Sequence, residues 1–326
     1  MSASPPLASA RPPLLVMVGP TASGKTDLAI ELAEALGGEI VSADSVQVYR
    51  GLDIGSGKAT AEQRARVPHH CLDLVAPDQL FDAASYRRHA EAALADLYAR
   101  GRLAVVTGGT GLYVRALLFG LLPAPGASPE LRARLEEELR RSSVEQLHAR
   151  LARVDPQLAA RLSPRDLPRI QRGLEVHEAT GAPLSAWQQQ HGFRRQLHPA
   201  LLFGIRWERE LLRERIARRC RAMLATGFLE EVQALRRAGY GPALRPMQSL
   251  GYREMNLVLD GVLGLEEALQ LQIRNTCRYA RRQMTWFGSD PQVCWLPGPV
   301  DPAAAIRLAR DALAEHGGPG GKRRER

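Results

Sequence analysis

The sequence predicts an α/β fold, in which a P-loop-containing parallel sheet is flanked by helices and interrupted by an inserted all-helical domain. Short apolar runs with strand character alternate with amphipathic helices over the first 125 residues. This alternation is typical of a parallel sheet that is covered on both faces. The pattern is helical from residue 128 to about 195, and strand character returns at Leu201–Trp207. We therefore predict a catalytic core of residues 14–127 and 196–316 around a helical insertion of residues 128–195.

Within this frame, each element is predicted from its apolar spacing and its flanking residues. Strands before the insertion are expected at Leu14–Val18, Glu39–Ala43, Cys71–Val75 and Leu103–Thr107, with helices at Lys25–Leu36 and Ala83–Arg100. The insertion is expected to contain helices at Pro129–Arg141, Val144–Val154, Asp155–Leu162 and Asp166–Thr180. Later helices are expected at Glu208–Thr226, Phe228–Ala238 and Leu265–Phe287. We expect the leader, residues 1–13, and the basic tail, residues 317–326, to be disordered.

The most specific local signal is a phosphate-binding loop that follows the first predicted strand. Its members match G-x-x-x-x-G-K-[ST] and are Gly19, Pro20, Thr21, Ala22, Ser23, Gly24, Lys25 and Thr26. The glycines allow backbone N–H groups to converge on an anion, and the following helix adds its dipole. The lysine adds a charge, and the threonine hydroxyl can hold Mg²⁺. We therefore predict that these eight residues bind a phosphate or diphosphate and that Thr26 is the metal ligand.

The distribution of charge indicates a polyanionic partner for the second part of the chain. The formal net charge of +9 divides into −1 for residues 1–120 and +10 for residues 121–326. Solvated, arginine-rich helix faces are the alternative explanation, so charge alone favours nucleic acid only slightly. Lysine occurs only at Lys25, Lys58 and Lys322. Because lysine and arginine are not interchangeable at a phosphate site, the lysine in the loop supports the motif, and Lys58 is a second position of interest.

The cysteine and hydropathy patterns indicate the compartment. The four cysteines form no C-x-x-C pair, which argues against a zinc site or a disulfide framework and suits a reducing cytosol. The first apolar run is too short to direct export or to span a membrane. We therefore expect a cytoplasmic protein without a membrane partner. Nothing in the sequence indicates an obligate dimer, so we expect a monomer.

Polar residues follow two further predicted strands, at the edge of the sheet where the phosphate loop is expected. Asp44 could hold Mg²⁺ through water or take a proton from a nucleophile, and capping a turn is its alternative role. Thr110 follows two adjacent glycines and could hydrogen-bond a ligand. Neither Leu14–Val18 nor Leu103–Thr107 ends in the acidic residue with which energy-coupling ATPases hold Mg²⁺. This disfavours a nucleotide-driven motor and favours a transferase that acts on a diphosphate or a nucleotide.

Basic and aromatic residues of the C-terminal half suit contact with an anion and with RNA. Arg215 and Arg219 are four residues apart in a predicted helix, and one of them could stabilise charge on a departing phosphate. Amide, arginine and aromatic side chains interleave at residues 247–253 and 278–287, a composition that suits backbone contact and base stacking. For Trp286 and Phe287 we favour a place in the core.

Taken in order, these motifs resemble those of bacterial tRNA dimethylallyltransferases. The resemblance rests on Gly19–Thr26, Asp44–Gly55, Val67–His70, Gly108–Tyr113, Arg169–Val176, Gly251–Tyr252 and Arg282–Phe287, within residues 14–296. It implies transfer of a dimethylallyl group from dimethylallyl diphosphate to N6 of the adenosine at tRNA position 37, next to the anticodon, with Mg²⁺. The diphosphate would be held by the phosphate loop and released.

The resemblance also implies residue roles. Asp44 would be the general base on the adenine amino group, Thr110 would lie beside the reacting centre, and Lys25 with Arg219 or Arg215 would neutralise the leaving group. Contacts with tRNA are implied for Asp44, Ser45, Val46, Gln47, Arg132, Pro168, Arg169, Ile170, Gln171, Arg172, Met247, Gln248, Ser249, Leu250, Gly251, Tyr252, Arg281, Arg282, Gln283, Thr285 and Trp286. Gly288 stands where the family usually has arginine.

Two other functions stay open on the residues alone. The same loop would serve a free-nucleotide prenyltransferase or a small-molecule kinase, neither of which needs a basic helical insertion. A non-catalytic RNA-binding regulator would need the basic helices but not a working loop.

Overall fold

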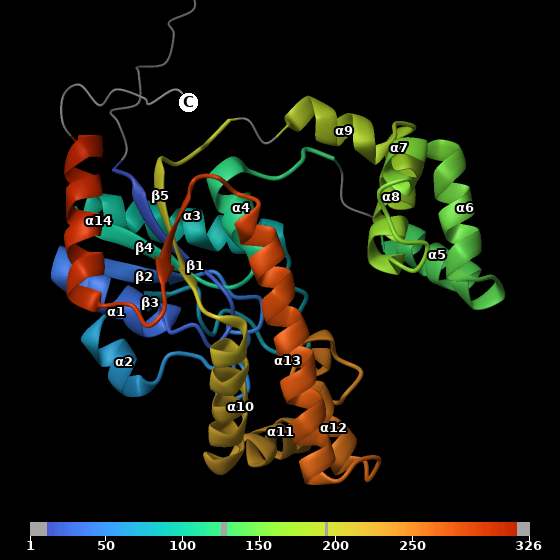
Figure 1. Ribbon diagram of the computed structural model, residues 1–326. Helices are drawn as coiled ribbons and strands as arrows, with labels where there is room; N and C mark the ends of the chain where they lie inside the picture. Colours follow the sequence, from blue (N-terminus) through green and yellow to red (C-terminus); the bar gives the residue numbers. More distant parts are fainter. Residues whose placement is uncertain (1–11, 125–128, 193–194, 318–326) are drawn as a thin grey trace, which may run out of the picture. The chain divides into compact units, whose positions relative to one another are not determined.

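The computed structural model describes residues 12–124, 129–192 and 195–317 (Figure 1). The chain divides into two compact units. The first contains the described residues up to Leu118 and from Leu197 onward, and the second is residues 119–196. Each unit is described by itself.

The first unit is built on a six-stranded parallel sheet with the order β3-β2-β4-β1-β5-β6. Its strands are β1 (Leu14–Val18), β2 (Gly38–Ser42), β3 (His69–His70), β4 (Leu103–Thr107), β5 (Ala200–Arg206) and β6 (Val293–Pro297). All residues of β1 are fully buried, because this central strand is covered on both faces. The predicted α/β class is confirmed, and β1 and β4 have the predicted bounds.

The prediction of a strand at Cys71–Val75 is wrong. The strand in this region is only His69–His70, and the backbone then turns, with φ of 62° at Cys71 and 55° at Asp73. The turn directs Asp73 toward Lys58, whose Nζ lies 2.7 Å from Asp73 Oδ1. The left-handed backbone at Cys71 and Asp73 is incompatible with an extended strand, and apolar content alone cannot reveal this.

Helices cover both faces of the sheet (Figure 1). Apolar side chains of α1 (Lys25–Leu36) and α14 (Pro302–Gly317) form one core cluster with Leu15 and Met17 of β1. On the other side, α3 (Ala83–Ala99) packs on β2 and β4, and α4 (Gly111–Phe119) follows β4. The short α2 (Ala61–Arg66) packs against α1.

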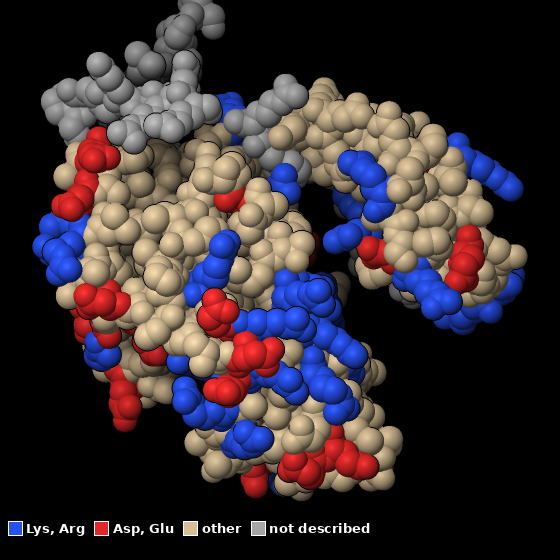
Figure 2. Space-filling model, in the orientation of Figure 1, with Lys and Arg blue, Asp and Glu red and all other residues tan. Residues whose placement is uncertain are grey.

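A second group of helices follows β5 in the same unit. It comprises α10 (Arg209–Ala225), α11 (Phe228–Arg237), the 3₁₀ turn η1 (Arg245–Gln248), α12 (Tyr252–Leu259) and α13 (Leu265–Gly288). The longest, α13, packs on α10 and α12. Figure 2 shows basic side chains gathered on one face of this group. The predicted helices agree with α10, α11 and α13 to within about a residue, whereas α2, α12, α14 and β6 were not predicted.

The second unit is helical. It contains α5 (Pro129–Arg141), α6 (Val144–Val154), α7 (Pro156–Ala159), α8 (Leu167–Thr180) and α9 (Leu184–His191). Leucines of α5, α6 and α8 form its core, which is fixed by the fully buried Asp155. The two carboxylate oxygens of Asp155 accept the N–H groups of Leu158 at 3.0 Å and Ser185 at 2.8 Å. Among the described residues no helix is long and apolar enough to cross a bilayer.

Candidate active site

The phosphate loop, Gly19–Thr26, joins the carboxyl end of β1 to the start of α1 in an unusual backbone conformation. Gly19, Ala22 and Gly24 have φ of 136°, 64° and 90°. A Cβ on Gly19 would lie 3.1 Å from the Ile205 carbonyl oxygen, so glycine is needed there for space as well as for φ. Within the described part of the chain, the N–H groups of Gly24, Lys25 and Thr26 donate to no other group. The loop therefore presents free donors at a helix N-terminus, which is an anion site.

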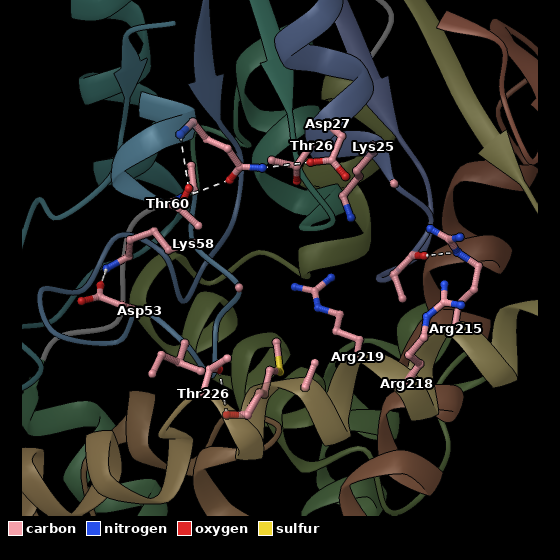
Figure 3. A pocket seen from close by; sticks show the side chains of 18 of the residues that line it. Lys25, Thr26, Asp27, Asp53, Lys58, Thr60, Arg215, Arg218, Arg219 and Thr226 are labelled. Carbon is pink, nitrogen blue, oxygen red and sulfur yellow. Dashed lines mark hydrogen bonds and ion pairs between the residues drawn. The ribbon is translucent and has the colours of Figure 1, made fainter. Parts of the chain in front are cut away.

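Two cations converge on this loop. The pKa of Lys25 is lowered to about 8, first by burial and then by repulsion from Arg219, while Asp44 opposes the change. Burial is also the main cause that lowers the pKa of Arg219, and Asp44 again opposes it. The Arg219 Nη1 atom lies 3.5 Å from Thr21 Oγ1, and Figure 3 shows the guanidinium directed toward Lys25. Two desolvated cations beside free N–H groups strongly favour an anionic ligand.

Asp44 lies at the carboxyl end of β2, and its turn is fixed to the end of β4. One carboxylate oxygen, Oδ1, accepts the N–H groups of Val46 at 2.8 Å and Gln47 at 3.3 Å. The Thr110 Oγ1 atom accepts the Ser45 N–H at 3.0 Å. Asp44 therefore caps its own turn, the alternative role considered for it, and is also the acid whose charge acts on Lys25 and Arg219. Thr110 holds the turn that carries this carboxylate.

Gln283 of α13 links two of the loops. Its Oε1 accepts the Thr21 N–H at 2.8 Å, and its Nε2 donates to the Gly109 carbonyl at 2.9 Å. The side chain is buried, and a Cβ on Gly109 would lie 2.1 Å from Nε2. The amide therefore fixes the phosphate loop to the glycine pair after β4, and the absence of a side chain at Gly109 makes room for it.

Three cavities meet at these residues. The loop cavity, of about 960 Å³, is lined by Lys25, Thr26 and Arg219 together with α2 and α10. The helix cavity, of about 640 Å³, is lined by Thr21, Asp44 and Arg219 together with α12 and α13. A central cavity of about 60 Å³ is lined by all five of these residues. A ligand held by the phosphate loop and a ligand entering beside Asp44 would therefore approach each other across the central cavity.

Comparisons with known proteins identify the family. A family profile described as "IPP transferase" matches residues 47–290. The chain belongs to the IPP transferase family. It is 51% identical over 298 residues to "tRNA dimethylallyltransferase 1" of Pelobacter propionicus, covering 91% of this chain and 96% of that protein. It is 52% identical over 295 residues to "tRNA dimethylallyltransferase" of Anaeromyxobacter dehalogenans, covering 90% and 98%.

A solved structure agrees with this assignment. The full-length "tRNA isopentenylpyrophosphate transferase" of Bacillus halodurans is 36% identical, with a TM-score of 0.69, and covers 93% of this chain and 96% of that chain. The resemblance drawn from the motifs is thus confirmed, and so is the predicted class of enzyme, a transferase. The P-loop fold with a parallel sheet is that of an IPP transferase.

In this IPP transferase the residues expected at the tRNA surface fall into two groups. Exposed or half-buried side chains are those of Asp44, Ser45, Val46, Gln47, Pro168, Arg169, Gln171, Arg172, Gln248, Ser249, Leu250, Arg281, Arg282, Thr285 and Trp286. The Arg132 side chain lies outside the described residues. Trp286 is 40% exposed, so the prediction that it belongs to the core is wrong, whereas Phe287 is buried as predicted. Trp286 and Phe287 are adjacent in sequence but lie on different faces of α13, one exposed and one buried.

The side chains of the second group are buried and pack inside the protein. Ile170 lies in the core of the helical unit, and Met247 is fully buried under α12. The Tyr252 hydroxyl donates to Glu231 Oε1 at 2.6 Å inside the protein. Gln283 serves the phosphate loop, and Gly251 is buried at the start of α12. Motif matching by itself does not distinguish exposed from buried side chains, so the tRNA contacts of both groups stay predictions.

Two further residues of this IPP transferase were not given roles by the sequence. Glu231 accepts the N–H groups of Asp53, Ile54 and Gly55 at 3.1, 2.6 and 3.2 Å, and thereby shapes the wall between the loop and helix cavities. Lys58 Nζ has three partners, among them the Tyr49 carbonyl at 2.8 Å, so it cross-links the wall and is not available to a ligand. The rarity of lysine drew attention to Lys58; no sequence signal indicated Glu231.

Proposed function

We propose that this IPP transferase moves the dimethylallyl group of dimethylallyl diphosphate to N6 of the adenosine at tRNA position 37. The observation that carries the proposal is the central cavity, which Lys25 and Thr26 line from the loop side and Asp44 lines from the helix side. The donor diphosphate would occupy the phosphate loop. The target base would enter through the helix cavity, whose rim includes Arg278 and Arg282.

The proposed reaction fits the charged groups on the two sides of the central cavity, the cations at the phosphate loop and the Asp44 carboxylate. The bond between donor C1 and the diphosphate oxygen breaks, and a bond from adenine N6 to C1 forms. Negative charge grows on the leaving oxygen, where the free N–H groups, Lys25 and Arg219 stabilise it. The N6 proton passes to Asp44, because the lone pair of this amine is delocalised and the amine is a weak nucleophile until it loses a proton. Extruding the base costs a few kcal/mol, which contacts between basic helices and phosphates would offset.

The residues present also fit Mg²⁺. The described residues contain no group of three or more His, Cys, Asp or Glu that could hold a metal by themselves. Magnesium commonly takes one or two protein ligands and completes its shell with substrate phosphates and water. Thr26 lines both the loop and central cavities, so its hydroxyl would hold the ion against the diphosphate. When bound, the ion would supply neutralising charge to the leaving group.

The test is incubation with labelled dimethylallyl diphosphate, Mg²⁺ and unmodified tRNA, followed by nucleoside analysis. We expect labelled N6-dimethylallyladenosine from tRNA, release of one diphosphate per transfer, and no product from AMP. A tRNA with guanosine at position 37 is the control. Efficient transfer to AMP would indicate a free-nucleotide enzyme instead, and tight RNA binding without turnover would indicate a regulator. We also propose that the chain is a monomer, which sedimentation of the purified protein would test, and that it is cytoplasmic, which cell fractionation would test.

A further inference from the structure

Two consecutive carbonyl groups of the phosphate loop are held from outside the loop. Arg215 Nε donates to the Ala22 carbonyl at 2.9 Å, and Trp207 Nε1 donates to the Ser23 carbonyl at 2.9 Å. The Arg215 guanidinium carbon lies 4.2 Å from the centroid of the Trp207 ring, so the two side chains stack on each other. Figure 3 shows the Arg215 guanidinium beside the loop backbone, whereas the Arg219 guanidinium is directed toward Lys25.

These contacts determine where the loop N–H groups point. In a trans peptide the C=O of one residue and the N–H of the next point in opposite directions. Because Trp207 holds the Ser23 carbonyl outward, the Gly24 N–H points to the inner side of the loop, where it donates to no described group. The Ala22 carbonyl belongs to the peptide whose Ser23 N–H donates to the Pro20 carbonyl at 3.3 Å, closing the turn.

The backbone at this turn needs such support. Ala22 has φ of 64°, in the left-handed region that a residue with a Cβ adopts at a cost. The Ala22 carbonyl accepts a hydrogen bond from Arg215. The Trp207 ring stacks against the Arg215 guanidinium and is itself held by its hydrogen bond to the Ser23 carbonyl. A Cβ on Gly298 would come within 2.3 Å of the indole, so the absence of a side chain there makes room for Trp207.

We propose that Arg215 and Trp207 form a buttress that orients the phosphate loop, so that Arg215 is a positioning residue and Arg219 alone of this pair faces the diphosphate. The assignment rests on the proposed function, since it concerns how the loop is presented to the donor. Arg219 lines all three cavities, while Arg215 lines only the loop cavity and uses its Nε on the loop backbone. A buttress of this kind raises affinity by holding the N–H groups ready for the anion.

The experiment compares matched variants of the full chain. Trp207→Phe keeps a ring beneath Arg215 but removes the N–H that holds Ser23. Arg215→Lys keeps the charge but loses the planar fork, and Arg215→Met loses both. The controls are Trp295→Phe and Arg206→Lys, because Arg206 lies 4.8 Å over the Trp295 ring in the same kind of stack without a bond to the phosphate loop.

Three quantities are measured: the Kd of Mg²⁺ with inorganic diphosphate in the absence of tRNA, the diphosphate-induced amide shift of Gly24 in glycine-labelled protein, and the KM for tRNA. We expect each of the three variants, Trp207→Phe, Arg215→Lys and Arg215→Met, to weaken diphosphate binding by about tenfold. This corresponds to the loss of one hydrogen bond from the loop N–H of Gly24 to the charged diphosphate. The Gly24 shift should shrink, while the KM for tRNA stays unchanged. The resonance of Gly37, which caps the other end of α1, should also stay unchanged. The controls should behave like the unmodified chain.

Recovery of affinity in Arg215→Lys, but not in Arg215→Met, would mean that Arg215 contacts the diphosphate through its charge and would overturn the proposal. Unchanged binding and an unchanged Gly24 shift in Trp207→Phe would overturn it as well. The proposed function fails separately, if the unmodified chain binds diphosphate but transfers no prenyl group to tRNA. Circular dichroism of each variant establishes that it is folded.

Discussion

Asp44→Asn isolates the charge of the proposed base from its structural role. In the native turn Asp44 Oδ1 accepts two N–H groups, from Val46 at 2.8 Å and from Gln47 at 3.3 Å. Asparagine keeps an oxygen at this position, so the turn is retained, whereas alanine would lose two hydrogen bonds worth about 1 kcal/mol each. The asparagine variant should therefore fold and bind tRNA like the native chain.

The expected loss is in the chemical step. A positioned base contributes about 10²- to 10⁴-fold, or about 3–5 kcal/mol of transition-state stabilisation. Single-turnover transfer from labelled donor to tRNA measures this loss, and filter binding measures tRNA affinity. Asp82→Asn is the matched control, because Asp82 Oδ1 accepts the Ser85 N–H at 2.7 Å as a helix cap away from the cavities. Turnover of Asp44→Asn within about threefold of native, in folded protein, would refute the assignment of the base.

Three further predictions concern the pH response, the phosphate loop and the beginning of β2. The pKa of Lys25 is about 8, so it loses its charge as pH rises through this value, and kcat/KM for the donor should fall above pH 8; a flat profile to pH 9.5 would contradict this. Gln283→Leu leaves the Thr21 N–H and Gly109 carbonyl without their partner. It should raise the KM for the donor and lower the free energy of unfolding in urea by about 1–3 kcal/mol. Native values of both quantities would contradict the role of Gln283 in linking the two loops. Interactions with Arg100 hold the pKa of Glu39 at about 2, below its usual 4.5, so the pair stabilises the fold at neutral pH and this contribution disappears as pH falls from about 4.5 to 2. Glu39→Gln should lower neutral-pH stability by about 1–2 kcal/mol and flatten that acid slope; an unchanged slope would show that other groups set it.

The elements predicted accurately are those whose signals are local. Leu14–Val18 is a continuous apolar run directly before a glycine-rich loop, and Lys25–Leu36 has helical spacing with Gly37 as its C-cap, so both have the predicted bounds. The edge strand Val293–Pro297 was missed because, unlike the continuously buried Leu14–Val18, it is only partly buried and alternates weakly between buried and exposed residues.

The site was predictable to the extent that it is contiguous in sequence. The phosphate loop and Asp44 follow strand ends, and parallel strands bring such ends to one edge. By contrast, the hydrogen bond between Thr21 and Gln283 joins residues 262 positions apart, and that between Ala22 and Arg215 joins residues 193 positions apart. Single-sequence patterns contain no information on such contacts. For the same reason the spacing of Arg215 and Arg219 placed both on one helix face but could not show which of them reaches the central cavity.

The most direct test of the account is a crystal structure with an unreactive thio-analogue of dimethylallyl diphosphate and a tRNA anticodon stem-loop. The account predicts the diphosphate on the N–H groups of Gly24 and Lys25. It also predicts donor C1 within about 3–3.5 Å of adenine N6 across the central cavity, with the Asp44 carboxylate beside that amino group. A diphosphate bound away from Gly19–Thr26, or an adenine amino group remote from Asp44, would contradict it.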